Sequence, residues 1–194
     1  LLGSLLLMMP EMSTGNVSFI DALFTSTSAT CVTGLITLDT ATMWTVKGHT
    51  ILLILMKVGG INIILFGAFL TLLGRLGVGM KHHLVVEDFV NKESVFSSKG
   101  MLGRIVLVSI LIELLGSILI FFQTTSSLTN MAFGQKLFFS LFHSVSAFNN
   151  AGFSTMSGGL YNDYLVNLQW FHITAGVLII FGSLGFTTLF DLLD

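Results

Sequence analysis

Charged residues are scarce in this 194-residue chain, and their scarcity excludes an ordinary soluble domain. Lys, Arg, Asp and Glu make up 9% of the sequence, whereas apolar residues make up 53%. A soluble domain carries about 25% charged residues. The mean hydropathy of the chain is +0.91, and its net charge of −2 gives no sign of a nucleic-acid partner. The composition therefore indicates an integral membrane protein.

Cysteine and proline are almost absent, since the chain has one of each, Cys31 and Pro10. A single cysteine excludes an internal disulfide and a cysteine-based zinc site. The phosphate-binding glycine loop, the His-Glu-x-x-His motif and the nucleophile elbow are also missing, so nothing in the sequence predicts an enzyme. The adjacent His82 and His83 lack a third ligand at metal-binding spacing. We therefore expect neither a resident metal nor a cofactor.

Three apolar segments reach the length of a membrane-spanning helix, which needs about 20 residues. They are residues 51–73, 105–122 and 173–190. A fourth apolar run, residues 1–9, stops at Pro10, because proline cannot continue a helix interior. The chain starts inside this run without an initiator methionine. We therefore expect a piece of a longer protein whose first span is incomplete here.

Two further apolar stretches, residues 17–29 and 137–148, are too short to cross a bilayer. As helices at 1.5 Å per residue each covers roughly 18–20 Å, about half the bilayer. Such segments can be re-entrant helices, which enter the membrane and return on the same side. Each is followed by small and polar residues and then by a full span. The order of span, half-helix, polar loop and span therefore occurs twice.

The repeat is visible residue by residue when Gly34 is aligned with Gly152. Residues 22–35 and 140–153 then share Leu, Phe, Ser, Ser, Ala and Gly, six of fourteen positions. Chance similarity between oily helices explains the shared Leu and Phe, but not the Ser-x-Ser-Ala motif and the glycine in register. A weaker similarity occurs in the spans that follow, where a five-residue shift aligns residues 59–61 with 182–184.

The sequence thus predicts an all-α integral membrane protein with two tandem membrane-pore-membrane repeats and re-entrant half-helices. The first repeat covers residues 1–74, a linker covers 75–104, and the second repeat covers 105–194. Five of the eight basic residues lie in the linker, which the positive-inside rule therefore places in the cytoplasm. Both loops that follow the half-helices then lie outside the cell.

The two loops, residues 30–35 and 149–153, carry the predicted chemistry. Non-helical backbone at membrane depth is tolerated only where it is buried in protein or lines an aqueous cavity. Rings of its carbonyls can replace the hydration shell of a cation. Glycine permits the backbone angles that turn successive carbonyls inward, and each half-helix points the negative end of its dipole at the cavity. Ordinary glycine turns between a surface helix and a span are the alternative.

These loops resemble the first and second pore loops of the Trk/Ktr/HKT superfamily of potassium transporters. The likeness rests on Thr-Ser-Ala-Thr-Cys-Val-Thr-Gly-Leu at residues 27–35 and Phe-His-Ser-Val-Ser-Ala-Phe-Asn-Asn-Ala-Gly-Phe-Ser at residues 142–154. Leu-Met-Lys-Val-Gly-Gly-Ile at 55–61 is similar to the helix after the first loop, and Ile-Glu-Leu-Leu-Gly at 112–116 to the outer helix of the second repeat. The bacterial Ktr- and Trk-type membrane subunits are the most similar members.

The resemblance implies four repeats around one pore in the plasma (inner) membrane, of which this chain holds two. It implies potassium transport through a carbonyl-lined selectivity filter, because plant relatives selective for sodium carry serine where this chain has Gly34. It also implies three partners, namely the remaining half of the subunit, a second copy in a homodimer, and a nucleotide-binding cytoplasmic regulatory subunit. The implied filter residues are Val32, Thr33, Gly34, Leu35, Asn150, Ala151, Gly152 and Phe153.

A secondary transporter of a small solute, with broken helices at its centre, is the alternative function. Inverted repeats would put the two loops on opposite sides of the membrane, whereas the basic linker puts both outside. A structural membrane protein would give no reason for the glycine loops.

Charged residues in or near the apolar segments give further expectations. Lys57 stands where the resembling family has an uncharged polar residue, and Asn62 where it often has glycine. Helical counting separates Lys57 and Glu113 by about 12 Å in depth, so we expect Lys57 to reach toward the outer vestibule. We expect Glu113 to accept hydrogen bonds from pore-helix groups. Asp21 suits the positive end of the first half-helix, and Asp39 could attract cations to the pore mouth or be a solvated loop residue.

Overall fold

The computed structural model describes residues 1–76, 99–124, 128 and 131–184. Regular structure in these ranges is helical apart from an isolated bridge between Ser13 and Trp44. The prediction of an all-α protein is thus confirmed. Among the helices in these ranges, the segment Val106–Thr124 is long and apolar enough to cross a membrane.

Residues 1–76, the described part of the first half, form four helices. The apolar segment at 17–29 forms α2, which begins after Ser18. The Ser18 hydroxyl accepts from the Asp21 backbone N–H over 3.1 Å and donates to the Asp21 carboxylate over 2.6 Å. A carboxylate in the first turn suits the helix dipole, as expected for Asp21. The helices are α1 (Leu2–Leu7), α2 (Phe19–Thr30), α3 (Thr40–Met43) and α4 (Val46–Leu76).

In the second half a long helix is followed by a shorter helix, a loop and a further helix. The predicted half-helix at 137–148 begins four residues earlier than its apolar run and ends with it. Part of the third predicted span, residues 185–190, lies outside the described residues. The helices are α7 (Lys99–Thr124), α8 (Phe133–Phe148), the short 3₁₀ helix η1 (Gly159–Tyr161) and α9 (Gln169–Ser183).

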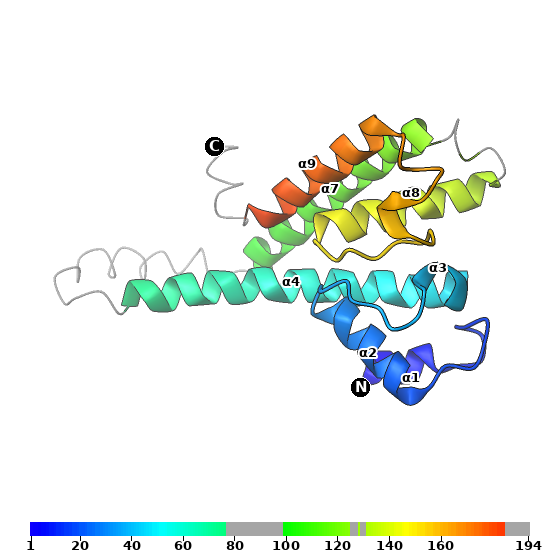
Figure 1. Ribbon diagram of the computed structural model, residues 1–194. Coiled ribbons are helices and arrows are strands. Elements are labelled where there is room, and N and C mark those ends of the chain that lie inside the picture. The colour runs from blue at the N-terminus through cyan, green and yellow to red at the C-terminus, as the bar shows by residue number, and fades with distance from the viewer. Residues whose placement is uncertain (77–98, 125–127, 129–130, 185–194) are drawn as a thin grey trace.

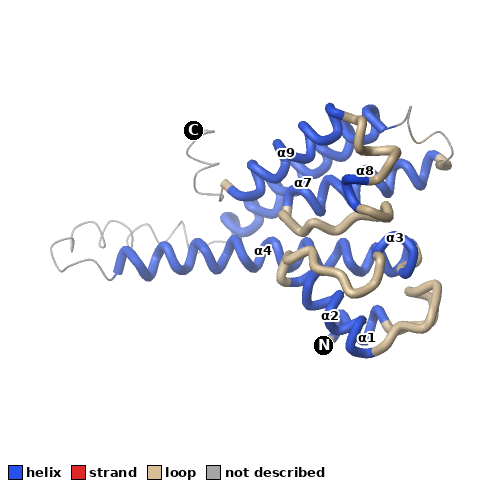
Figure 2. The backbone as a smooth tube through the Cα atoms, viewed as in Figure 1, coloured by secondary structure: helices blue, strands red, loops and turns tan. Residues whose placement is uncertain are grey.

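The long helix α4 separates two groups of helices (Figure 1). Helices α1 and α2 pack against one side of it, and α7, α8 and α9 form a bundle on the other side. The loops after α2 and α8 are the tan segments that lie beside α4 in Figure 2. The arrangement therefore brings together two loops that are far apart in the sequence.

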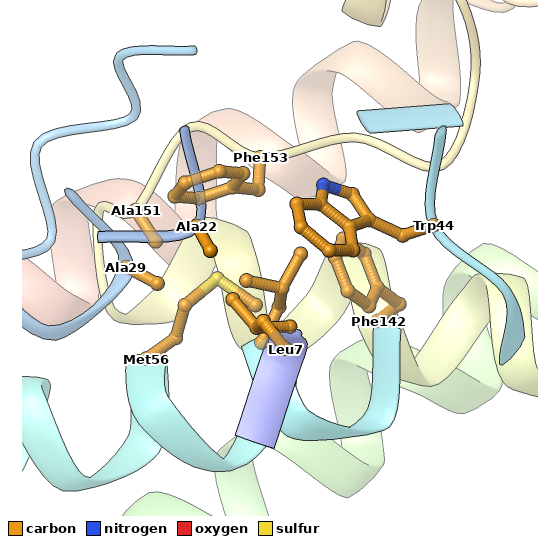
Figure 3. Close-up of a cluster of buried hydrophobic side chains, with 9 residues drawn as sticks. Leu7, Ala22, Ala29, Trp44, Met56, Phe142, Ala151 and Phe153 are labelled. Carbon is orange, nitrogen blue, oxygen red and sulfur yellow. The ribbon is translucent and has the colours of Figure 1, made fainter. Parts of the chain in front are cut away.

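One buried cluster joins the two halves (Figure 3). Ala22 and Ala29 of α2 belong to it together with Ala151 and Phe153 of the second loop, and all four are at most 3% exposed. A second cluster lies within the α7–α8–α9 bundle around Phe148 and Leu178. Because burying apolar side chains stabilises a fold by roughly 25 cal/mol per Å², the shared cluster holds the second loop against α2.

Candidate functional site: two apposed loops

The two loops have the same backbone conformation. In the first loop Val32 has a φ of 55° and Gly34 a φ of 73°, and in the second Asn150 has 57° and Gly152 has 72°. The residues between them, Thr33 and Ala151, are not left-handed. Alternation of left-handed and ordinary residues makes these loops non-helical backbone, which a carbonyl-lined cation site requires.

Each half-helix ends in the same hydrogen-bond pattern. In the first, the Thr33 N–H donates to the Ser28 carbonyl over 3.0 Å and the Val32 N–H donates to Ala29 over 3.3 Å. The equivalent bonds in the second run from Ala151 to Ser146 over 2.8 Å and from Asn150 to Ala147 over 3.0 Å. This is the Schellman pattern, which satisfies carbonyls at a helix end with amides of the following loop.

The pattern leaves most of the loop carbonyls without a protein donor. Among the described residues, the exception within the predicted filter is Phe153, whose carbonyl accepts from the Ser146 hydroxyl over 2.7 Å. Water or an ion can supply a partner to a carbonyl that has no donor within the protein. Within the described part of the chain, no donor reaches the carbonyls of Val32, Thr33, Gly34, Leu35, Asn150, Ala151 or Gly152.

The loops touch each other at their glycines. A Cβ built on Gly34 would lie 2.5 Å from the carbonyl oxygen of Ala151 and 3.2 Å from the Cα of Gly152. A Cβ built on Gly152 would lie 3.5 Å from the Cα of Gly34. Two loops 118 residues apart in sequence therefore meet at the residues that the alignment pairs.

A glycine on the following helix packs against the end of each half-helix. A Cβ on Gly59 of α4 would overlap the carbonyl oxygen of Thr30, the last residue of α2. A Cβ on Gly182 of α9 would overlap the carbonyl oxygen of Phe148, the last residue of α8. The weak alignment of Gly59 with Gly182 thus corresponds to equivalent contacts.

Hydroxyl and imidazole groups form hydrogen bonds that hold the two loops against the helices before them. The Thr33 hydroxyl donates to Ser28 Oγ over 2.9 Å. The buried His143 of α8 donates from Nδ1 to the Phe139 carbonyl over 2.9 Å, so Nε2 of the neutral ring accepts from the Ser154 hydroxyl, also over 2.9 Å. Spacing in the sequence did not reveal the Ser154 contact.

Asp39 links the segments that follow the two loops. Its carboxylate caps α3 by accepting from the Ala41 backbone N–H over 3.1 Å, and it accepts from the Ser157 hydroxyl over 2.5 Å. The side chain is exposed. Asp39 therefore has a structural role that the sequence did not reveal, and a role in attracting cations stays a prediction.

The expectation that Lys57 reaches toward the outer vestibule was wrong. Its ammonium lies 2.7 Å from Glu113 Oε1 and donates to Ser109 Oγ over 2.7 Å. The depth count began at the edge of the apolar run, whereas α7 begins at Lys99, six residues before residue 105. The expectation for Glu113 is confirmed, because Asn149 at the end of α8 donates to the same Oε1 over 2.9 Å.

No group of three or more His, Cys, Asp or Glu side chains within the described ranges could hold a metal ion. His82 and His83, and residues 77–98 of the predicted linker, lie outside the described residues, as does the side chain of Asn62.

The described architecture is that of a helical protein with a membrane-length helix and two apposed loops. Residues 2–194 match the TrkH family, described as "Cation transport protein". The chain belongs to this family, which confirms the resemblance inferred from the loop motifs.

Three relatives from different bacteria show the same likeness. Ktr system potassium uptake protein B of Bacillus subtilis is 37% identical over 196 residues, covering 100% of this chain and 42% of that protein. The protein of the same name in Vibrio alginolyticus is 32% identical over 97% of this chain and 40% of its own length. Potassium/sodium uptake protein NtpJ of Enterococcus hirae is 31% identical over 100% of this chain and 42% of its own length. The chain thus spans about two fifths of the length of these relatives.

Proposed function

We propose that this chain is the part of a potassium transporter that supplies two of the four loops of its selectivity filter. The observation that carries the proposal is the contact between two loops of alternating handedness, with carbonyls that no described donor satisfies. Carbonyls held in a ring can replace the water around a potassium ion. Four loops would complete the ring, so we assign transport to the longer protein.

In this proposal α2 and α8 are re-entrant half-helices that enter from outside the cell. The 12 and 16 residues of these helices correspond to about 18 Å and 24 Å, each less than the thickness of a bilayer core. Their carboxyl ends lead into the two loops, so the negative ends of both dipoles favour a cation there. Equivalent glycine contacts and hydrogen bonds in the two halves support tandem repeats.

Potassium is the proposed substrate, and the names of the relatives support it. Two are named for potassium uptake and the third for potassium and sodium. A second copy of the subunit and a nucleotide-binding cytoplasmic subunit are the proposed partners, and the plasma membrane the proposed location. No step of this function requires catalysis by the chain.

The test is ion uptake by the full-length protein in a strain that lacks other potassium systems. We expect potassium uptake to exceed sodium uptake, and Gly34→Ser to reduce the ratio of the two. Equal uptake of both ions by the wild type would contradict the proposed filter. Uptake of an organic solute instead of either ion would favour a secondary transporter.

A further inference from the structure

A buried ion pair lies beside the end of the second half-helix. Lys57 of α4 reaches Glu113 of α7 over 2.7 Å, and their side chains are 18% and 6% exposed. The Lys57 ammonium also lies 5.9 Å from the centre of the Phe148 ring, at the last residue of α8. A cation near the carboxyl end of a helix and the face of an aromatic ring is favourable.

The same carboxylate oxygen holds Asn149, the residue that caps α8. Asn149 Nδ2 donates to Glu113 Oε1 over 2.9 Å and to the Val145 carbonyl over 2.8 Å. On the α4 side, Asn149 Oδ1 packs against Gly60. A Cβ built on Gly60 would lie only 2.0 Å from this oxygen. The Asn149 amide is therefore fixed by α4 and α7 together.

Asn149 is the first residue of the second loop and directly precedes the left-handed Asn150. The equivalent residue of the first loop is Cys31, whose side chain is exposed. The clamp formed by Lys57, Glu113 and Asn149 thus belongs to the second loop. Charged partners make its hydrogen bonds stronger than those between neutral groups.

We infer that Lys57 and Glu113 are positioning residues that hold the second loop through Asn149 and thereby set its preference among alkali cations. The inference rests on the proposed function, and neither side chain contacts the ion. Lys57 orients Glu113, Glu113 orients Asn149, and Asn149 fixes the position from which the backbone of Asn150, Ala151 and Gly152 starts. Discrimination between potassium and sodium depends on the arrangement of such carbonyls.

Two double variants of the full-length protein separate this positioning role from a merely structural ion pair. Lys57→Gln with Glu113→Gln removes both charges but keeps an oxygen at residue 113 that accepts from Asn149. Lys57→Met with Glu113→Leu removes the charges and the acceptor. We expect the first to keep the wild-type ratio of potassium to sodium uptake. We expect the second to lower the ratio about tenfold, which corresponds to roughly 1.4 kcal/mol.

The matched control is Glu11→Gln. Glu11 pairs with Lys47 in an exposed ion pair, where the side chains are 69% and 63% exposed, so the ratio should not change. The amount of each variant in the membrane is measured in parallel. A wild-type ratio in the Met/Leu variant would overturn the inference, and so would an equal loss in both double variants, because charge alone would then set the ratio.

If the Met/Leu variant does not accumulate, Asn149→Leu decides, since it leaves the ion pair intact and removes its link to the loop. A wild-type ratio in that variant overturns the inference. Gly34→Ser in the same assay tests the proposed function separately. A lowered ratio with Gly34→Ser but an unchanged one with Lys57→Met/Glu113→Leu would refute only the positioning role, whereas no change with Gly34→Ser would refute the filter itself.

Discussion

The Cα of Gly152 lies 3.2 Å from the place that a Cβ on Gly34 would occupy. The approach is unequal, because the nearest atom to a Cβ on Gly152 is the Cα of Gly34 at 3.5 Å, an ordinary contact. Both glycines have a left-handed φ, which a side chain disfavours by roughly 1–2 kcal/mol. Gly34 thus carries a steric constraint in addition to the conformational one.

The first prediction follows from this inequality. Gly34→Ser should weaken discrimination between potassium and sodium more than Gly152→Ser, because its Cβ would displace the Ala151 carbonyl. We expect both proteins to accumulate nearly normally, since the loops are held by packing from the half-helices. The measurement is the uptake ratio, with Gly176→Ser in α9 as control, because a Cβ there meets nothing within 4 Å. An unchanged ratio in Gly34→Ser would falsify the assignment.

The second prediction concerns the glycines that receive the ends of the half-helices. Gly59→Ala and Gly182→Ala should each destabilise the protein by about 1–3 kcal/mol, the cost of overpacking, because the methyl group would overlap a backbone carbonyl. Gly176→Ala, on the same helix as Gly182, should be harmless. Thermal unfolding of the purified full-length variants in detergent would measure the effect. Equal midpoints for Gly182→Ala and Gly176→Ala would contradict the packing.

The third prediction isolates the charge of Asp39. Asparagine also caps helices, so Asp39→Asn should keep α3 and remove only the negative charge. Potassium uptake should then slow at low ionic strength and approach the wild-type rate at high ionic strength, because screened attraction acts over about 10 Å at 0.1 M salt. Selectivity should stay the same.

Asp39→Ala is the informative comparison for that variant. It removes the charge and the cap together and should also destabilise the outer segment, by about 0.5–2 kcal/mol for the cap. A salt-independent defect in Asp39→Asn would rule out electrostatic attraction. A change in the selectivity of Asp39→Asn would indicate that Asp39 acts in the filter and not at the pore mouth.

The fourth prediction tests the sides of the membrane. In a Cys31→Ser background, a cysteine at Tyr161, which is 82% exposed, should react with a membrane-impermeant reagent on intact cells. A cysteine at Ser97, in the predicted cytoplasmic linker, should react only after permeabilisation. The two sites serve as controls for each other in one labelling experiment. Reaction at Ser97 from outside would reverse the proposed orientation.

The sequence predicted the helices and the positions of the two loops because both leave local signals. Apolar run lengths marked α2 and α8 within a few residues, and the aligned glycines at 34 and 152 marked one left-handed position in each loop. The contact between those glycines left no such signal, because pairing residues by similarity does not say that they touch. The roles of Asn149 and Ser154 likewise depend on packing between distant segments.

The error at Lys57 has a definite physical origin. Depth was counted from the ends of apolar runs, but helices extend beyond them into polar sequence. The six additional residues at the start of α7 amount to about 9 Å at 1.5 Å per residue. The three additional residues at the end of α4 add back about 4.5 Å. The net shortening of about 4.5 Å brings the two long side chains within reach of each other. Hydropathy marks the oily part of a helix, whereas the helix itself determines which side chains meet.

Val32 and Asn150 occupy equivalent left-handed positions at different energetic cost. Asparagine adopts this conformation readily, whereas a β-branched residue there is a genuine outlier, and such strain costs of order 1–3 kcal/mol. The two loops therefore share a shape but not a stability. We expect local opening to begin at the first loop, with faster hydrogen exchange at its amides, and Val32→Asn to slow that exchange. The two loops thus have the same backbone conformation, but the closed conformation of the first loop has the shorter lifetime.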